Sequence, residues 1–247
     1  MASGNIHLCI DNGNTYTKVG VFENDKLVFD TLFTNCTIDD ITNLIQKYAP
    51  TACILCNVSN INLNLEVFLK KSFSHFINFD EHTIIPIQNE YKQPETLGKD
   101  RLAAVIGANF LKPDLDLLVI DAGTAITYDF IDRRSVYQGG NIAPGMSMRF
   151  NALHHFTAKL PLVEPCGEFE LLGQTTNDAI LSGVMNGIVF EIKGYFEALK
   201  FKYTELSIFL TGGSLNYFVS KLKSPIFAER NLVLIGLNRI LQFNVKK

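Results

Sequence analysis

The stretch IDNGNTYTKVGVF, residues 10–22, places an acid, Asp11, at the end of an apolar run and then Gly13 and other small polar residues. Lys18 follows inside a second run in which apolar and polar residues alternate. Alternation of this kind, interrupted by Asn-Gly and Asn-Asp, predicts antiparallel strands joined by tight turns. The predicted strands are residues 6–10, 16–22 and 26–34. The chain is therefore expected to begin with a β-meander.

After the meander, helical and strand patterns alternate, which indicates the α/β class. Thr37, with Asp40 three residues later, begins an amphipathic helix that ends before Pro50. The same patterns predict further elements in the first half of the chain. These are a strand at 52–58, a short helix at 64–73, a strand at 82–87 and a helix at 100–111.

The second half repeats the opening pattern. LDLLVIDAGTAITYDFID, residues 115–132, can be laid over residues 5–22 so that Asp121 falls on Asp11 and Gly123 on Gly13. Two strands that end in Asp-x-Gly, half a chain apart, predict duplication of one domain with a cleft between the copies. The predicted domains are residues 1–114 and 115–247.

Downstream of the second hairpin the patterns are again those of an α/β domain. The predicted elements are a strand at 135–145 that runs into a Gly/Pro turn, a helix at 146–156, a loop at 157–176, a helix at 178–199, a strand at 206–213 and a C-terminal helix at 234–243.

Composition limits the possible functions. Of 247 residues, 47% are hydrophobic and 19% are charged, which suffices for the core of a globular protein. The formal net charge is -3 and the pI is about 6.0, so the chain offers no general attraction to nucleic acids or anionic membranes. No run approaches the roughly 18–20 apolar residues of a membrane span. We therefore expect a cytoplasmic protein with neither kind of partner.

Three groups of residues invite a metal or redox interpretation. Cys53 and Cys56 have CxxC spacing but lie in an apolar, strand-like run, so buried free thiols are favoured over a zinc or redox site. His154 and His155 are adjacent on a predicted helix and point in different directions, which favours surface or interface histidines. His7 and Cys9 follow the strand alternation and are interpreted as packing residues.

The polar hairpin tips suggest a phosphate site. A turn of Gly, Asn and Thr can direct backbone N–H groups and a hydroxyl toward a phosphate, although one such turn is equally typical of an ordinary hairpin. The second copy, DAGTAIT, makes nucleotide binding the favoured interpretation, because two acids would converge where a polyphosphate and its cations lie. LTGG, residues 210–213, fits a turn beside adenine or ribose, but is more typical of a plain strand-to-helix turn.

Four motifs occur in a fixed order: DNGNTYTK at 11–18, YKQPETLGKDR at 91–101, DAGTAIT at 121–127 and GGNIAPG at 139–145. Together they resemble the type III pantothenate kinase family, within the superfamily of sugar kinases, heat-shock chaperone ATPases and actin. The resemblance runs from residue 6 to about residue 187. It implies two duplicated ribonuclease H-like (actin-like ATPase) domains, each a mixed five-stranded sheet flanked by helices, with the active site in the cleft between them.

The resemblance also implies an activity, the ATP-dependent phosphorylation of pantothenate to 4'-phosphopantothenate, the first step of coenzyme A biosynthesis. It implies ATP with Mg²⁺, a monovalent cation (K⁺ or NH₄⁺) bound by Asp121, and a homodimer. The residues that match the ATP-binding positions are Asp11, Asn12, Gly13, Asn14, Thr15, Tyr16, Thr17, Lys18 and Thr124. Those that match the pantothenate-binding positions are Tyr91, Gly98, Lys99, Asp100, Arg101 and Thr176, with Asp100 as the proton acceptor.

Plainer interpretations stand beside these. An isolated GKDR would more often make Asp100 a helix cap and Arg101 a surface charge. Two other functions are also considered: a regulatory protein that keeps the nucleotide-binding scaffold without catalysis, and a small kinase for another hydroxy acid or a sugar. The regulator is disfavoured because it would have no need for Asp11, Asp100 and Asp121 together, and competition between pantothenate and sugars would test the other kinase.

Overall fold

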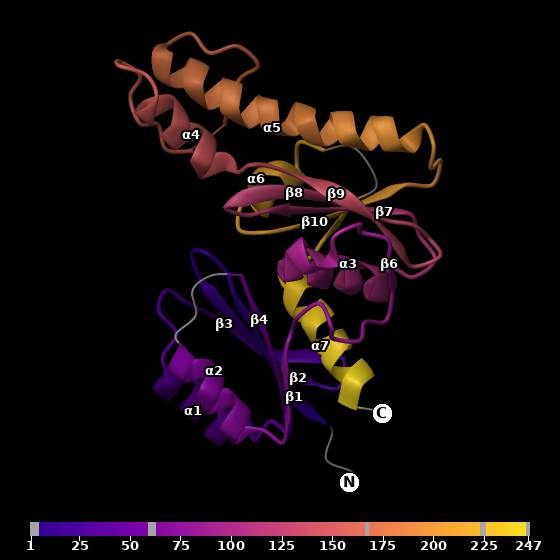
Figure 1. Cartoon of the computed structure of the whole chain (residues 1–247). Coiled ribbons are helices and arrows are strands. Elements are labelled where there is room, and N and C mark those ends of the chain that lie inside the picture. The colour runs from indigo at the N-terminus through magenta and orange to yellow at the C-terminus, as the bar shows by residue number, and fades with distance from the viewer. Residues whose placement is uncertain (1–4, 59–62, 166–167, 223–225, 246–247) are drawn as a thin grey trace. The chain divides into compact units, whose positions relative to one another are not determined.

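The computed structural model describes residues 5–58, 63–165, 168–222 and 226–245, which fall into two compact units (Figure 1). Unit 1 consists of Met1–Asp114, Ile131–Gly139 and Asn231–Lys247, and unit 2 of Leu115–Phe130 and Gly140–Arg230. The C-terminal segment thus belongs to the N-terminal unit, whereas a single boundary after residue 114 would place it in the second. The reason is that the last helix packs on elements of unit 1.

Unit 1 begins with the predicted meander: β1 (Ile6–Asn12), β2 (Thr17–Glu23) and β3 (Lys26–Phe33) pair antiparallel. Helices α1 (Ile38–Tyr48) and α2 (Leu63–Ser72) alternate with β4 (Ala52–Asn57) and β5 (His75–Asn78), which extend the sheet in parallel. The strand order is β3-β2-β1-β4-β5, so this is a mixed five-stranded sheet. The predicted α/β class is confirmed.

Two layers of helices cover the sheet of unit 1. Leu8 and Ile10 of β1 point to α1 and α2, where Ile41 and Leu69 are buried against them. On the other face lies α7 (Leu232–Val245), which contacts β1, β2 and β4 (Figure 1). This follows from the strand period of two, which sends alternate residues to opposite faces.

Helix α3 (Lys99–Leu111) packs against α7 in unit 1. The two backbones approach closely at Gly107 and Gly236: a Cβ on Gly107 would lie 3.0 Å from the backbone nitrogen of Gly236. Small residues at a helix crossing permit this approach. The packing holds α3, whose first turn carries Asp100 and Arg101 of the GKDR motif, against α7.

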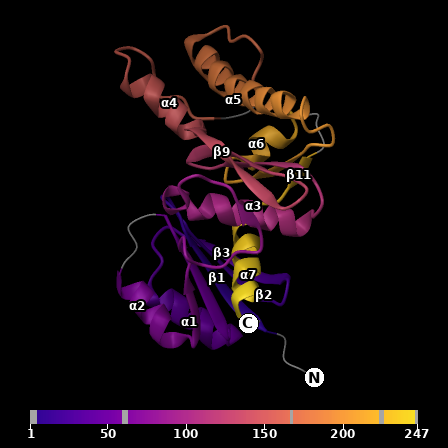
Figure 2. The ribbon, with the colours of Figure 1, turned by 45° about the vertical axis from the view of Figure 1, so that its right-hand side comes forward.

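The second hairpin consists of β7 (Leu117–Ala122) and β8 (Ala125–Ile131) and lies almost wholly in unit 2. It is followed by β9 (Val136–Pro144), which begins in unit 1 and continues into unit 2 from Gly140. β10 (Ser207–Thr211) pairs in parallel with β7 and with β11 (Ile226–Ala228). Helices α4 (Met146–His155), α5 (Thr176–Lys200) and α6 (Leu215–Val219) are labelled in Figure 2. They contribute side chains to the same core as the strands. The predicted helices and strands of this half are therefore confirmed, and α6 and β11 are additions.

The second sheet has the order β11-β10-β7-β8-β9-β6, which makes six strands instead of the expected five. The additional strand is the two-residue β6 (Gln88–Asn89), which pairs with Val136 and Tyr137 at the beginning of β9. All four of these paired residues belong to unit 1.

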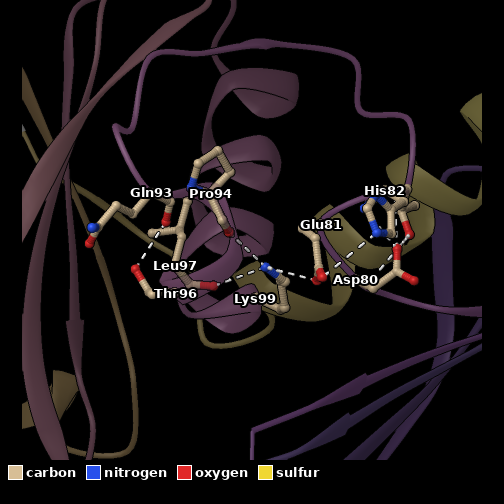
Figure 3. A network of polar contacts seen from close by, with 9 residues as sticks. Asp80, Glu81, His82, Gln93, Pro94, Thr96, Leu97 and Lys99 are labelled. Carbon is tan, nitrogen blue, oxygen red and sulfur yellow. Dashed lines mark hydrogen bonds and ion pairs between the residues drawn. The ribbon is translucent and has the colours of Figure 1, made fainter.

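The strand predicted at 82–87 is wrong. Asp80 Oδ1 accepts the N–H groups of His82 at 3.0 Å and Thr83 at 2.9 Å, so the chain turns there (Figure 3). The apolar residues that suggested a strand do not form a buried face, since Ile84 is 51% exposed. Pro86 also lacks the N–H that a central strand needs.

The described part of the chain contains no helix with the length and apolar character needed to cross a membrane.

Candidate active site

The turn between β1 and β2 carries the acid-tipped motif of unit 1. Asp11 lies in β1 opposite Lys18 of β2, and the N–H of Gly13 donates to the carbonyl oxygen of Tyr16 at 3.0 Å, which closes the turn. The residues at its tip, Asn14, Thr15 and Tyr16, are exposed. The tip is therefore accessible to a ligand, and Asp11 lies in the strand that leads into it.

A side-chain network holds the base of this turn. The buried Thr17 donates its hydroxyl to Asn12 Oδ1 at 2.7 Å, and Asn12 Nδ2 donates to Asn57 Oδ1 at 2.8 Å. Asn57 ends β4, so the network ties the hairpin to the neighbouring strand. The sequence gives no sign of Asn57, because it follows an ordinary apolar run and belongs to none of the four motifs.

The first turn of α3 carries Asp100 and Arg101. Gly98 is the N-cap, so the plain interpretation of Asp100 as the helix cap is wrong. Asp100 Oδ1 accepts the N–H of Arg101 at 2.8 Å, and the positive end of the helix dipole favours a carboxylate at this position. The plain interpretation of Arg101 is also wrong, because only 6% of this residue is exposed.

The thiol of Cys56 in β4 is influenced by acids from two of the motifs. Burial raises the pKa of the Cys56 thiol, the charges of Asp11 and Asp100 raise it further, and the charge of Lys99 lowers it. Asp11 is also the partner of Cys56 in the parallel β1–β4 register. The strand pairing thus places Asp11 beside this buried thiol, and the charge of Asp100, which is far from Asp11 in the sequence, acts on the same thiol.

The side chain of Lys99 turns back onto the segment that precedes α3 (Figure 3). Its Nζ donates to the carbonyl oxygens of Pro94 at 3.0 Å and Leu97 at 3.2 Å, and lies 4.0 Å from Oε2 of Glu81. The ammonium group thus holds the short turn η1 (Pro94–Thr96) against the beginning of α3. Contact between Lys99 and pantothenate stays a prediction.

Arg101 contacts two tyrosines. Its Nη2 donates to the hydroxyl of Tyr137 at 3.3 Å, and its Cζ lies 5.9 Å from the ring centroid of Tyr91. The structure therefore brings together Tyr91 and Arg101, both predicted from the 91–101 motif. It adds Tyr137, which lies in the predicted strand at 135–145 but was assigned no function.

In unit 2, the second acid lies against two glycines. A Cβ on Gly123 would lie 3.2 Å from Asp121 Oδ1, and one on Gly212 would collide with the same oxygen. Gly212 belongs to LTGG, so this turn packs against the Asp-x-Gly turn. The carbonyl oxygen of Thr124 accepts the N–H of Gly145 at 3.2 Å, which joins the DAGTAIT and GGNIAPG motifs.

Thr176 is exposed at the first position of α5, and the cap of that helix is its neighbour Thr175, whose hydroxyl oxygen accepts the N–H of Asp178 at 3.2 Å. His154 and His155 are exposed, as predicted for surface histidines. His7 is buried, with Nδ1 2.8 Å from Asn238 Oδ1, which confirms that it packs inside unit 1.

Cys9, Cys53 and Cys56 are buried free thiols, as predicted. Within the described ranges, no three side chains of His, Cys, Asp and Glu are grouped so that they could hold a metal ion.

Comparisons with known proteins agree with the motifs. The family model described as type III pantothenate kinase matches residues 7–198. A type III pantothenate kinase of Phocaeicola vulgatus is 47% identical over 241 residues, covering 98% of this chain and 100% of the relative. One from Cytophaga hutchinsonii is 42% identical over 240 residues, with 97% and 100% covered.

A solved structure supports the fold. The Campylobacter jejuni protein, described there as a conserved Baf family transcriptional activator, is 23% identical with a TM-score of 0.63, and 97% of this chain and 100% of that one are covered. At this level of identity the similarity concerns the fold alone.

Proposed function

The chain belongs to the type III pantothenate kinase family and phosphorylates pantothenate with ATP, and we propose that Asp11 and Asp100 belong to the one site where this transfer takes place. The product is 4'-phosphopantothenate, formed in the first step of coenzyme A biosynthesis, and the acceptor is an alcohol. The assignment of the residues is supported by the positions of Asp11 beside Cys56 in the strand register and of Asp100 in the first turn of α3, whose charges both act on the Cys56 thiol.

Asp100 is the proposed proton acceptor. Phosphoryl transfer needs little covalent work from the protein, but the attacking hydroxyl must be positioned and must lose its proton. A carboxylate in the first turn of α3 can orient the primary hydroxyl of pantothenate and take that proton late in the transfer. Arg101 can clamp the carboxylate at the other end of pantothenate with two parallel hydrogen bonds. Tyr91, Gly98, Lys99 and Thr176 complete the proposed substrate contacts.

The proposed ATP contacts are the hairpin residues and one threonine of unit 2. The exposed tip of the first hairpin is accessible to phosphates, and Lys18 supplies a positive charge. Mg²⁺ would come with the nucleotide, since this ion usually binds through substrate phosphates and retained waters. The full proposed set is Asp11, Asn12, Gly13, Asn14, Thr15, Tyr16, Thr17, Lys18 and Thr124.

A monovalent cation, potassium or ammonium, is proposed at Asp121. Asp121 lies near the end of β7, and its carboxylate, packed against Gly123 and Gly212, offers an anionic oxygen ligand to the ion. A cation bound there would supply positive charge toward the phosphates of ATP.

The two Asp-x-Gly hairpins support descent from a duplicated ribonuclease H-like domain, with residues 1–114 and 115–247 as the two copies. We also propose a homodimer. Several large apolar side chains of unit 2 are exposed, and surfaces of this kind often form interfaces between subunits. They are Ile142, Met148, Phe156, Leu171, Leu172 and Phe190. The cytoplasm is the proposed location, because ATP is available there.

The test is an assay of phosphopantothenate formation with ATP, Mg²⁺ and potassium. Asp100→Asn should lower kcat by about 10²–10⁴-fold, the usual contribution of a general base, and leave the fold intact. The matched control is Asp39→Asn, which changes another acid in the first turn of a helix, α1. Retained turnover in Asp100→Asn would exclude Asp100 as the acceptor, and sugars that outcompete pantothenate would indicate a different kinase.

A further inference from the structure

Tyr137 touches two side chains that are proposed to bind pantothenate. It lies near the beginning of β9, and its side chain is fully buried. Its hydroxyl accepts a hydrogen bond from Arg101 Nη2 at 3.3 Å. Its ring is stacked on that of Tyr91, with centroids 6.2 Å apart and planes 20° apart. Because Arg101 also lies over the ring of Tyr91, the three side chains form one cluster within unit 1.

The backbone of Tyr137 supports the same cluster. Tyr137 is the register partner of Asn89, and its carbonyl oxygen accepts the N–H of Glu90 at 3.0 Å. Asn89 Oδ1 in turn accepts the N–H of Tyr91 at 3.0 Å. Tyr137 therefore fixes both the segment that carries Tyr91 and the guanidinium group of Arg101.

An arginine that binds a carboxylate with two parallel bonds must present its planar guanidinium in one orientation. A long side chain loses entropy when it is held in this way, and an anchor that is already present in the free protein removes part of that cost from binding. A buried hydroxyl is an effective anchor, since hydrogen bonds to charged groups are stronger than neutral ones where water is excluded.

We propose that Tyr137 is a positioning residue that orients the guanidinium of Arg101 toward the carboxylate of pantothenate. This inference rests on the proposed function, in which Arg101 holds that carboxylate. Tyr137 acts through Arg101 and does not touch the atoms that react. The carboxylate lies at the opposite end of pantothenate from the hydroxyl that is phosphorylated, so the effect falls on substrate binding.

The test is Tyr137→Phe, which removes the hydroxyl and keeps the ring. KM for pantothenate should rise roughly tenfold, the typical effect of losing one hydrogen bond to a charged group. The kcat and the KM for ATP should stay within about twofold of those of the unmodified protein, because the transferred phosphate is elsewhere. The control is Tyr48→Phe, the same change at a tyrosine of α1 whose ring contacts Phe29.

A double-mutant cycle separates positioning from general support of the fold. Arg101→Lys keeps the charge but loses the planar fork, so adding Tyr137→Phe to it should raise KM for pantothenate little further. Additive effects would overturn the inference. The inference would also be overturned if Tyr137→Phe had the same KM for pantothenate as Tyr48→Phe. It would be overturned as well if kcat and both KM values changed together, or if Tyr137→Phe failed to fold. An unmodified protein that is inactive on pantothenate would instead refute the proposed function, before Tyr137 is tested.

Discussion

Gly98 lies directly against the carboxylate of Asp100: a Cβ at position 98 would be 2.7 Å from Asp100 Oδ1. The backbone of Gly98 has φ −53°, which any residue can adopt. The glycine is therefore required by the neighbouring carboxylate and not by the conformation of the chain. In the GKDR motif, glycine leaves room for the carboxylate that is proposed to take the proton.

Gly98→Ala should consequently damage catalysis more than stability. The added methyl would displace the carboxylate, which can move because it is the end of a side chain, and a displacement of about 1 Å can cost on the order of 10²-fold in rate. We expect kcat to fall by 10- to 100-fold, with a nearly unchanged melting temperature. Gly194→Ala is the control, since nothing lies within 4 Å of a Cβ there. Unchanged kcat would show that the position of this oxygen does not matter.

Lys99→Met should weaken the segment before α3. The change keeps the apolar stem but removes the donor to the carbonyl oxygens of Pro94 and Leu97 (Figure 3). We expect a loss of about 1 kcal/mol of unfolding free energy together with a higher KM for pantothenate. Denaturant unfolding and initial rates would measure the two effects.

The control for this change is Lys92→Met, at an exposed lysine just upstream. If Lys99 serves only to contact pantothenate, KM will rise while the unfolding free energy stays equal to that of the unmodified protein. That result would contradict the conclusion that the hydrogen bonds from Lys99 to the carbonyl oxygens of Pro94 and Leu97 stabilise this segment.

Local patterns predicted most of the fold, because most of its elements are determined by neighbouring residues. Thr37 and Asp40 form the expected capping box: Thr37 N–H donates to Asp40 Oδ2 at 2.9 Å, and Asp40 N–H donates to Thr37 Oγ1 at 3.2 Å. The meander and the second hairpin likewise follow from the strand period and the turn residues. The strand expected at 82–87 failed because the side chain of Asp80 provides a turn that competes with the apolar pattern.

The parts of the site that could not be predicted depend on contacts between distant segments. Nothing near Arg101 in the sequence shows that it is buried and bonded to Tyr137, which comes 36 residues later. Asn57 is similar, since the hydrogen bond that its side chain accepts from Asn12 joins two segments that are distant in the sequence. The motifs supplied the residue types, and the pairing of strands decided which of them meet.

Asp132 should make stability depend on pH. Burial favours its neutral form, but hydrogen bonds from Arg134 and Val136 and the charge of Arg134 outweigh this and lower its pKa below the ordinary value of 3.8. A carboxyl whose pKa is lower in the folded state stabilises the fold above its unfolded pKa, and this contribution is lost as the pH falls through the folded value.

Asp132→Asn should therefore be less stable than the unmodified protein at pH 7, and the difference should shrink below about pH 4. Urea unfolding at pH 7, 4 and 3 would measure it. The control is Asp114→Asn, at an exposed acid, which should show little difference at any pH. If the difference in unfolding free energy between Asp132→Asn and the unmodified protein stayed constant down to pH 3, the charged form of Asp132 would contribute nothing to stability.

Gly212→Ala should destabilise unit 2, whereas Gly213→Ala should not. Gly212 has φ +94°, and a Cβ there would lie 2.5 Å from the carbonyl carbon and 2.6 Å from the nitrogen of Ala122. Backbone atoms of a strand cannot give way as a side chain can, so we expect a loss of about 2 kcal/mol or more of unfolding free energy. Nothing lies within 4 Å of a Cβ on Gly213, which makes it the matched control.

The same substitution also tests the cation proposal. A methyl group on Gly212 would press against Asp121 Oδ1, so the fraction of Gly212→Ala that folds should need several-fold more potassium for half-maximal activity. Initial rates at increasing potassium concentration, at a temperature where both variants are folded, would measure this. Gly212→Ala could instead lose stability but keep the potassium dependence of Gly213→Ala. The cation would then not bind at Asp121, because the methyl group presses on that carboxylate.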